Sequence, residues 1–218
     1  MPRIRLNYKH YNAFLKKIEN GIYKKRYPQD LVLFHCYSKM RMEIALHAFR
    51  CLKKYLPPKK MQENPFRCGL HSFLVHIKSA VDSFTEEINL LYEIDPKLKT
   101  SGWRMSIEKL QQTKNWKKLE HENSKLFTEI SNTIDADWFR ELKTLRDEEA
   151  IHGRISGKNW QVELGGSSPI TTVGIRKVPD SITRCPNTPS ETIPDLKTWC
   201  LDILKETNRF LERCYKLM

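Results

Sequence analysis

Two residues about two thirds of the way along the chain, Arg146 and His152, have types and a spacing that suit acid–base chemistry on a phosphate group. An arginine keeps its charge at every physiological pH and binds phosphate oxygens with a planar fork of N–H donors. A histidine exchanges protons near neutral pH more readily than other side chains. Together they suit cleavage of RNA without a metal, in which the imidazole moves a proton and the guanidinium stabilises charge on the phosphoryl oxygens.

The sequence around this pair predicts that both residues lie near the end of one helix. Asp135 is suited to cap the start of that helix, and Gly153 is suited to stop it. At the carbonyl end the helix dipole favours a protonated imidazole, and Glu148 favours it further. Residues six apart on an ideal helix point about 120° away from each other. One chain therefore need not supply a compact Arg146–His152 pair.

The apolar periodicity of the whole chain predicts a mainly α protein. Residues with apolar side chains recur at steps of three and four, most clearly between Leu70 and Leu91. Long patterns of this kind cover about 31–55, 70–91 and 196–218, with further periodic segments at 119–134 and 135–153 and an additional N-terminal helix from Tyr8 to Glu19. We interpret them as an up-down bundle of four long helices preceded by the additional helix.

A change of pattern after Gly153 predicts a small β-hairpin insert at about 158–180, before the last helix. Two segments of strand-like composition, 160–164 and 170–178, flank a Gly-Gly-Ser-Ser-Pro turn. A loop rich in Pro, Ser and Thr follows up to Pro194. The length of 218 residues favours one domain, which we divide into a basic N-terminal arm (1–30) and a helical bundle with the hairpin insert (31–218).

The positive charge of the chain is concentrated at its N-terminal end. Residues 1–60 contain 15 Lys and Arg against three acids, which accounts for the whole net charge of +12. This asymmetry favours a polyanion as partner, with RNA as the first choice, and Lys24, Lys25 and Arg26 as candidate substrate-binding residues. Four tyrosines are interleaved as candidate base-stacking groups: Tyr8, Tyr11, Tyr23 and Tyr27. Alternatively, the lysines serve solubility and the tyrosines are core contacts.

No metal site, cofactor site or membrane segment is predicted. Six cysteines are spread along the chain without a Cys-x-x-Cys pair, so we expect reduced and mostly packed thiols. His47 and Cys51 have a spacing compatible with metal binding, but two further ligands cannot be identified. The first residues lack the apolar core of a signal peptide, and no apolar run approaches membrane-spanning length. We expect a cytoplasmic protein without a membrane partner.

The chain resembles the HEPN superfamily (higher eukaryotes and prokaryotes nucleotide-binding). The resemblance rests on the Arg146-x5-His152 spacing and on the order of helices over roughly residues 31–217, with the hairpin excluded. The resemblance implies a metal-independent endoribonuclease of toxin or defence type, with Arg146 and His152 as catalytic residues. It also implies a homodimer in which the motifs of two protomers share one cleft, and an antitoxin or other protein as a further partner. Arg154 is close enough in sequence to assist in binding the RNA backbone.

Three carboxylates, Asp147, Glu148 and Glu149, separate the two motif residues and would repel phosphate if they faced the cleft. Glu149 is also close enough in sequence to pair with Arg146. A second interpretation is therefore a non-catalytic HEPN-like scaffold that dimerises or binds nucleotides or RNA. A third treats the three acids as ligands of a two-metal nuclease, although consecutive acids on a helix point in different directions.

Overall fold

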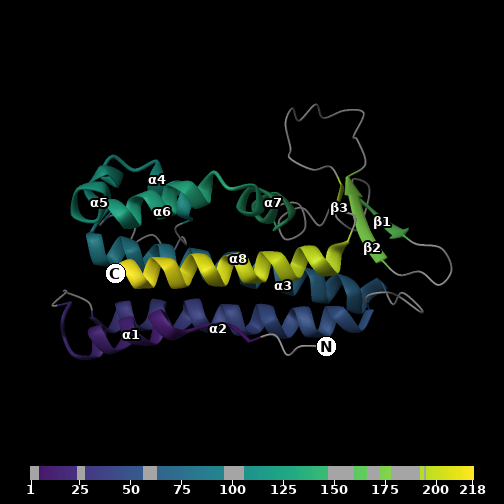
Figure 1. The fold of residues 1–218 in the computed structure, drawn as a ribbon, viewed down its shortest axis with the longest axis horizontal. Coiled ribbons are helices and arrows are strands. Elements are labelled where there is room, and N and C mark those ends of the chain that lie inside the picture. The colour runs from purple at the N-terminus through teal and green to yellow at the C-terminus, as the bar shows by residue number, and fades with distance from the viewer. Residues whose placement is uncertain are drawn as a thin grey trace. The chain divides into compact units, whose positions relative to one another are not determined.

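The computed structural model describes residues 5–23, 28–55, 63–95, 106–146, 160–165, 172–177, 192–193 and 195–218 (Figure 1). Eight α-helices and three short strands lie in these ranges. The prediction of a mainly α protein is confirmed. No helix within the described ranges has both the length and the apolar character needed to cross a membrane.

The chain divides into two compact units. The first unit comprises Met1–Met42, Ser79–Ala136 and Lys205–Met218, and the second comprises Glu43–Lys78 and Asp137–Leu204. Each unit contains parts of three long helices, which are α2 (Pro28–Leu52), α3 (Glu63–Tyr92) and α8 (Leu196–Leu217). Residues on both sides of the predicted arm boundary at position 30 belong to the first unit.

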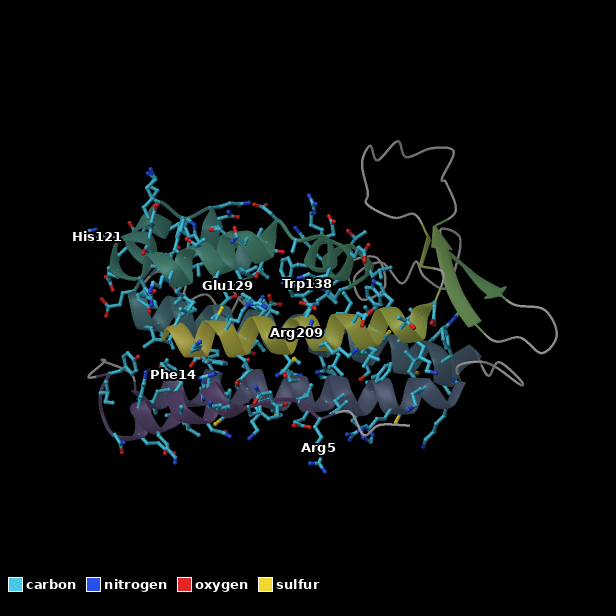
Figure 2. The ribbon with its side chains drawn as sticks, in the orientation of Figure 1. Arg5, Phe14, His121, Glu129, Trp138 and Arg209 are labelled. Carbon is cyan, nitrogen blue, oxygen red and sulfur yellow. The ribbon has the colours of Figure 1, made fainter. Side chains whose placement is uncertain are left out.

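The first unit also contains four shorter helices: α1 (Lys9–Glu19), α4 (Ile107–Gln111), α5 (Trp116–Glu122) and α6 (Ser124–Ile134). Helix α1 buries Tyr11, Phe14 and Ile18, whose spacing of three and four places them on one face. Phe14 turns toward the other helices of this unit in Figure 2. Helix α6 buries three side chains at the same spacing. Amphipathic periodicity therefore explains why these short helices form and which face each one buries.

Helix α1 is held on α8 by polar side chains of α8 instead of by a cap of its own. Its N-cap residue, Tyr8, makes no side-chain capping hydrogen bond. The carboxylate of Glu212 accepts hydrogen bonds from the backbone N–H groups of His10 (2.9 Å) and Tyr11 (3.0 Å). One turn earlier, the side chain of Asn208 accepts from the backbone N–H of Asn7 and donates to its carbonyl, both at 2.9 Å. Two of the N–H groups that every helix start leaves unpaired are thereby satisfied from α8.

The C-terminal end of α8 is in turn bound by side chains that follow the start of α1. The carbonyl oxygen of Met218 accepts hydrogen bonds from the Lys17 ammonium (3.2 Å) and the Tyr23 hydroxyl (2.6 Å). Because residues 7, 10 and 17 bind successive positions along α8, helix α1 runs parallel to α8. The basic N-terminal segment is thus an integral part of the first unit.

The second unit contains α7 (Asp137–Arg146), which buries Phe139, Leu142 and Leu145. The indole N–H of Trp199 on α8 donates to the Glu141 carboxylate on α7 at 2.8 Å. The ammonium of the buried Lys78, on α3, lies 5.4 Å from the centre of the Phe139 ring. These contacts fix the apolar face of α7 against α3 and α8 within this unit.

Three strands form an antiparallel sheet in the order β1 (Trp160–Gly165), β2 (Thr172–Lys177) and β3 (Thr192–Ile193). The ends of β1 and β2 pair as Trp160 with Lys177 and Gly165 with Thr172. Both strands lie in the segment for which the sequence predicts a hairpin. The residues that join them lie outside the described ranges, so the hairpin as a whole stays a prediction. The two-residue strand β3 was not predicted, because so short a segment carries no periodicity.

Three of the predicted long helices are present as α2, α3 and α8, whereas the predicted helix 119–134 is divided in two. In its place the structure has α5 and α6, and α7 covers the described part of the predicted helix 135–153. Asn123 separates α5 from α6 in an extended conformation, and its side chain accepts from the backbone N–H of Leu126. Asp135 ends α6 and does not start α7, which begins at Asp137. A short polar break at Asn123 therefore divides a pattern that looks continuous from 119 to 134 in sequence.

The capping role of Glu212 can be tested by substitution. We expect Glu212→Ala to lower the free energy of unfolding by about 1–2 kcal/mol, because two N–H groups of α1 lose their acceptor. The matched change Glu206→Ala, on the same helix, removes only the ion pair with Arg209 and should cost no more than about 0.5 kcal/mol. Urea denaturation measures both values, and equal losses would contradict the capping role.

Candidate functional site

Arg146 is the one predicted catalytic residue that the structure describes. It is the last residue of α7 and is half-buried. The apolar stripe of α7 fixes this helix, and a cation in the last turn is favoured by the helix dipole. A guanidinium at this position can bind an anion and stabilise negative charge. Whether it does so depends on residues that follow α7.

The other predicted site residues lie outside the described ranges. They are His152, Arg154, Lys24, Lys25 and Arg26. The three acids that follow Arg146, at 147–149, also lie outside these ranges. The structure therefore does not bring Arg146 and His152 together or separate them, and their shared site stays a prediction.

Exposed cations of the first unit come from both ends of the sequence. Arg5, Lys9 and Lys16 are exposed on or next to α1, and Arg5 extends away from the helices in Figure 2. Four further exposed cations lie on α8: Lys205, Arg209, Arg213 and Lys216. Their spacing of four, four and three residues places them along one side of the helix. Because α1 is bound to α8, we refer to these seven residues together as the α1–α8 cationic surface.

The α8 part of this surface was missed because residues 61–218 carry no net charge as a whole. The sequence signal for this part of the surface is the three- and four-residue spacing of the cations within the last helix. That spacing is lost when the charges are summed over residues 61–218. Acids compensate part of it, since Arg213 Nε is 2.7 Å from the Glu129 carboxylate and Arg209 pairs with Glu206. Lys9, Lys16 and Lys216 lie at exposed positions on the two helices.

The interpretation of the tyrosines as base-stacking groups is wrong for Tyr11. Its ring is buried and stacks on the ring of His35, with centroids 3.7 Å apart. Tyr8 packs edge-on against Tyr11, and the ammonium of Lys39 lies 5.0 Å from the centre of the Tyr8 ring. Tyr23 binds the carbonyl of Met218, and Tyr27 lies outside the described ranges. Tyr8, Tyr11 and Tyr23 therefore take part in packing and hydrogen bonds of the first unit.

A buried hydrogen-bonded cluster in the first unit joins His35, Glu87, Tyr11 and Tyr215. His35 Nδ1 is 2.8 Å from Glu87 Oε1, and the Tyr215 hydroxyl donates to Glu87 Oε2 at 2.9 Å. His35 Nε2 is 3.1 Å from the carbonyl oxygen of Tyr11, and the Tyr11 hydroxyl donates to the carbonyl of His35 at 2.8 Å. A carbonyl can only accept, so Nε2 carries a hydrogen and one proton is shared between Nδ1 and the Glu87 carboxyl.

Burial sets the protonation of this cluster. The loss of solvent raises the pKa of Glu87, and the contacts with His35 and Tyr215 only partly oppose that effect. Burial, followed by the nearby Glu87 carboxyl, raises the pKa of Tyr215 well above 10.0, so its hydroxyl remains a donor. The side chains of His35 and Glu87 have no exposed surface, which leaves no path to a substrate. The cluster therefore contains residue types that are common in active sites, but its buried location is that of a structural hydrogen-bond network.

This cluster was also missed in the sequence, although a signal was present. His35 and Ser38 interrupt the buried face of α2 between Leu31 and Met42, at the spacing of apolar core positions. A polar residue at such a position needs a hydrogen-bonding partner. The partner, Glu87, is 52 residues away and cannot be identified from local pattern.

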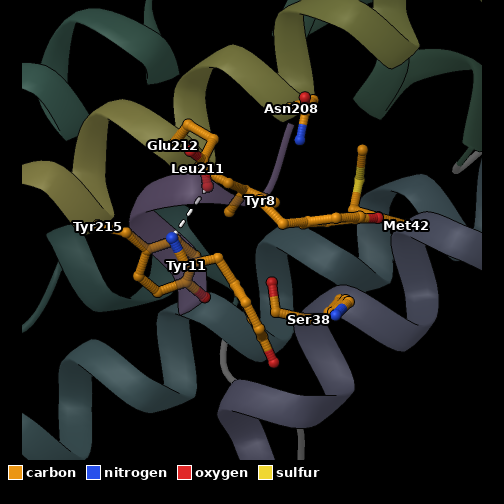
Figure 3. Close-up of a pocket in the computed structure, with 9 residues that line it drawn as sticks. Tyr8, Tyr11, Ser38, Met42, Asn208, Leu211, Glu212 and Tyr215 are labelled. Atoms are coloured by element: carbon orange, nitrogen blue, oxygen red, sulfur yellow. Dashed lines mark hydrogen bonds between the residues drawn. The ribbon is translucent and has the colours of Figure 1, made fainter. Parts of the chain in front are cut away.

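A small pocket of about 10 Å³, which is room for about one water molecule, adjoins the cluster (Figure 3). Its walls include the rings of Tyr8, Tyr11 and Tyr215 and the side chains of Met42 and Leu211. Typical ligand pockets measure about 300–1,000 Å³. The cavity is therefore too small for a substrate, and we assign it to imperfect packing where α1 meets α2 and α8.

The thiols do not form a metal site in the described ranges. His47 Nε2 and Cys51 Sγ are 3.5 Å apart, but no group of three or more His, Cys, Asp or Glu side chains that could hold a metal occurs among the residues described. Cys200 and Cys214 are buried, and burial raises the pKa of both thiols well above 9.0. Cys36 and Cys68 are exposed, so the expectation of mostly packed thiols fails for these two.

No protein-family model, curated protein or solved structure matches this chain. The family resemblance based on Arg146-x5-His152 therefore stays a prediction. The case for a function rests on the chain's own residues, above all on the α1–α8 cationic surface and on the position of Arg146.

The raised pKa of Glu87 predicts a pH dependence. Because burial raises the pKa of this carboxyl above 4.5, the folded protein holds the carboxyl proton more tightly than the unfolded chain does. The resulting stability is complete below pH 4.5 and is lost as the pH rises through the raised pKa. Glu87→Gln keeps the shape but cannot ionise. We expect the unfolding free energy of wild type, relative to this variant, to fall with rising pH by up to about 1.4 kcal/mol per pH unit.

Urea denaturation at a series of pH values measures this difference. Glu120→Gln is the matched control, because Glu120 is an exposed glutamate of the same unit. That variant should follow the pH dependence of wild type. If the difference in unfolding free energy between wild type and Glu87→Gln stays constant with pH, the carboxyl does not retain its proton on folding.

Proposed function

We propose that the protein binds RNA, with the α1–α8 cationic surface holding the phosphate backbone. The observation that carries this proposal is the gathering of exposed cations from residues 5–16 and 205–216 on two helices that are bonded to each other. Because Tyr11 and its neighbours are used in packing, binding depends on charge more than on base stacking. We therefore expect strong salt dependence and little sequence preference.

Catalysis is the second step of the proposal, which follows the HEPN resemblance. In a HEPN-like up-down bundle, two protomers would form one cleft that contains Arg146 and His152 from each. The ribose 2′-hydroxyl attacks the adjacent phosphate while His152 transfers the proton and Arg146 stabilises the phosphoryl charge. The products are a 2′,3′-cyclic phosphate and a 5′-hydroxyl, so DNA is inert. Arg154 and the basic run Lys24–Arg26 bind neighbouring phosphates.

The biological role that fits this activity is a toxin or defence ribonuclease controlled by an antitoxin or another protein. The alternative is a non-catalytic scaffold that dimerises or binds RNA. The acidic run at 147–149 favours this alternative, because three carboxylates next to Arg146 oppose phosphate binding. RNA binding belongs to both versions, whereas cleavage belongs to the first alone.

The binding step predicts a weaker salt dependence when the cations are removed. We expect the triple variant Lys9→Gln, Lys16→Gln, Lys216→Gln to weaken binding of single-stranded RNA and to reduce the slope of log K against log salt by about 0.7 for each phosphate that the protein no longer neutralises. Fluorescence anisotropy at several salt concentrations measures this slope. The matched control replaces three exposed lysines of α5, α6 and the residues before them by Gln: Lys114, Lys117 and Lys125. Equal effects in both variants would show that RNA binding depends on the net charge of the protein and not on this surface.

The catalytic step predicts cleavage that survives chelation. We expect wild type to cut single-stranded RNA in excess EDTA, and Arg146→Ala and His152→Ala each to lose on the order of 100-fold in rate. Lys143→Ala, which removes an exposed cation of the same helix, should retain the activity. Absence of cutting, with unchanged RNA affinity in both variants, would leave the scaffold alternative. Cutting that EDTA abolishes would favour a metal-dependent nuclease.

A further inference from the structure

Helix α2 has a second apolar stripe that the protein leaves exposed. Leu33, Tyr37 and Met40 are 45%, 39% and 41% exposed, and Cys36 on the same helix is also exposed. Their spacing of three and four residues places them on one side of the helix over about two turns. We call these four residues the α2 stripe. All of them belong to the first unit.

The stripe is separate from the face with which α2 packs into the first unit. The buried positions of this part of α2 are Leu31, His35 and Met42. Each lies two residues from a stripe residue (Leu33, Tyr37 and Met40, respectively), which corresponds to about 200° around the helix. A surface helix normally has one apolar side and one polar side. An apolar stripe on the outer side, with an aromatic ring at its centre, is typical of an interaction surface.

The charges at the two ends of the stripe are opposite. Asp30 lies three residues before Leu33, and Arg41 follows Met40. If two α2 helices packed antiparallel about a two-fold axis near residues 36 and 37, Leu33 of each would face Met40 of the other. The same arrangement would bring Asp30 of each copy toward Arg41 of the other. The stripe is therefore complementary to itself, as a two-fold interface requires.

We propose that the α2 stripe docks on the α2 stripe of a second copy of this chain, in an antiparallel pair of helices. The observations that carry the proposal are the exposed side chains and the opposite charges at the two ends. A contact of about two helical turns is small, so the dimer is of the weak class and forms at micromolar concentration. The proposal does not depend on the proposed function, because it is tested without RNA and without any measurement of cleavage.

The position of Cys36 provides a direct test of this geometry. Near the two-fold axis, Cys36 of one copy lies close to Cys36 of the other, which allows a disulfide to form. We expect mild oxidation at micromolar concentration to give a covalent dimer that Cys36→Ser abolishes. Cys68→Ser, which removes the other cysteine that is exposed in the described ranges, should leave that product unchanged. Loss of the crosslink only in Cys68→Ser would overturn the assignment.

The apolar and charged parts of the stripe can be tested in solution by sedimentation equilibrium. We expect Leu33→Gln with Met40→Gln to raise the dimer dissociation constant by about tenfold or more, because two apolar side chains lose their burial. Ile22→Gln is the matched control, since Ile22 is 62% exposed outside the stripe and should change the constant by less than about twofold. Circular dichroism checks that each variant is folded.

A charge exchange makes the test independent of apolar area. Asp30→Arg should weaken the dimer by like-charge repulsion with Arg41 of the second copy, and the added change Arg41→Asp should restore it. A wild-type protein that stays monomeric at 100-fold above about 1 μM would overturn the proposal. If Leu33→Gln with Met40→Gln instead lowers RNA affinity in such a monomer, the stripe belongs to the RNA-binding surface.

Discussion

One buried carboxyl, that of Glu87, connects four helices of the first unit. It lies on α3, shares a proton with His35 on α2 and accepts from Tyr215 on α8, while His35 donates to the backbone of Tyr11 on α1. Each of these groups is expensive to bury alone and satisfies the others when buried together. The cluster therefore specifies one arrangement of the helices, since a shift of any one of them leaves a buried polar group without its hydrogen bond.

The arrangement fixed in this way determines where the surface charge lies. Because Tyr11 is stacked on His35 and Glu212 caps the start of α1, the basic N-terminal segment is held along α8. The cations of the first residues and those of the last helix thus lie on two helices that are hydrogen-bonded to each other, although in sequence the two groups are about 200 residues apart.

Local sequence patterns were sufficient to predict most of the individual helices. They were insufficient to predict the long-range contacts between these helices. The sequence predicts α1 to within one residue of its start, and it predicts α2 and α8 to within a few residues of their ends. It does not place the break at Asn123, which divides the predicted helix 119–134 into α5 and α6. It also fails for the His35–Glu87–Tyr215 cluster, because partners 52 and 128 residues apart have no local signature. Of the predicted site, Arg146 is placed at the end of α7, and the remaining residues lie outside the described ranges.

The dependence of α1 on residues 208–218 has a consequence for the order of events during synthesis. The N-terminal helix is made first, yet the acceptors for its N–H groups emerge from the ribosome about 200 residues later. An isolated helix of 11 residues is marginal in water. The start of α1 therefore lacks these two acceptors for most of translation, and it gains them only when α8 has been released.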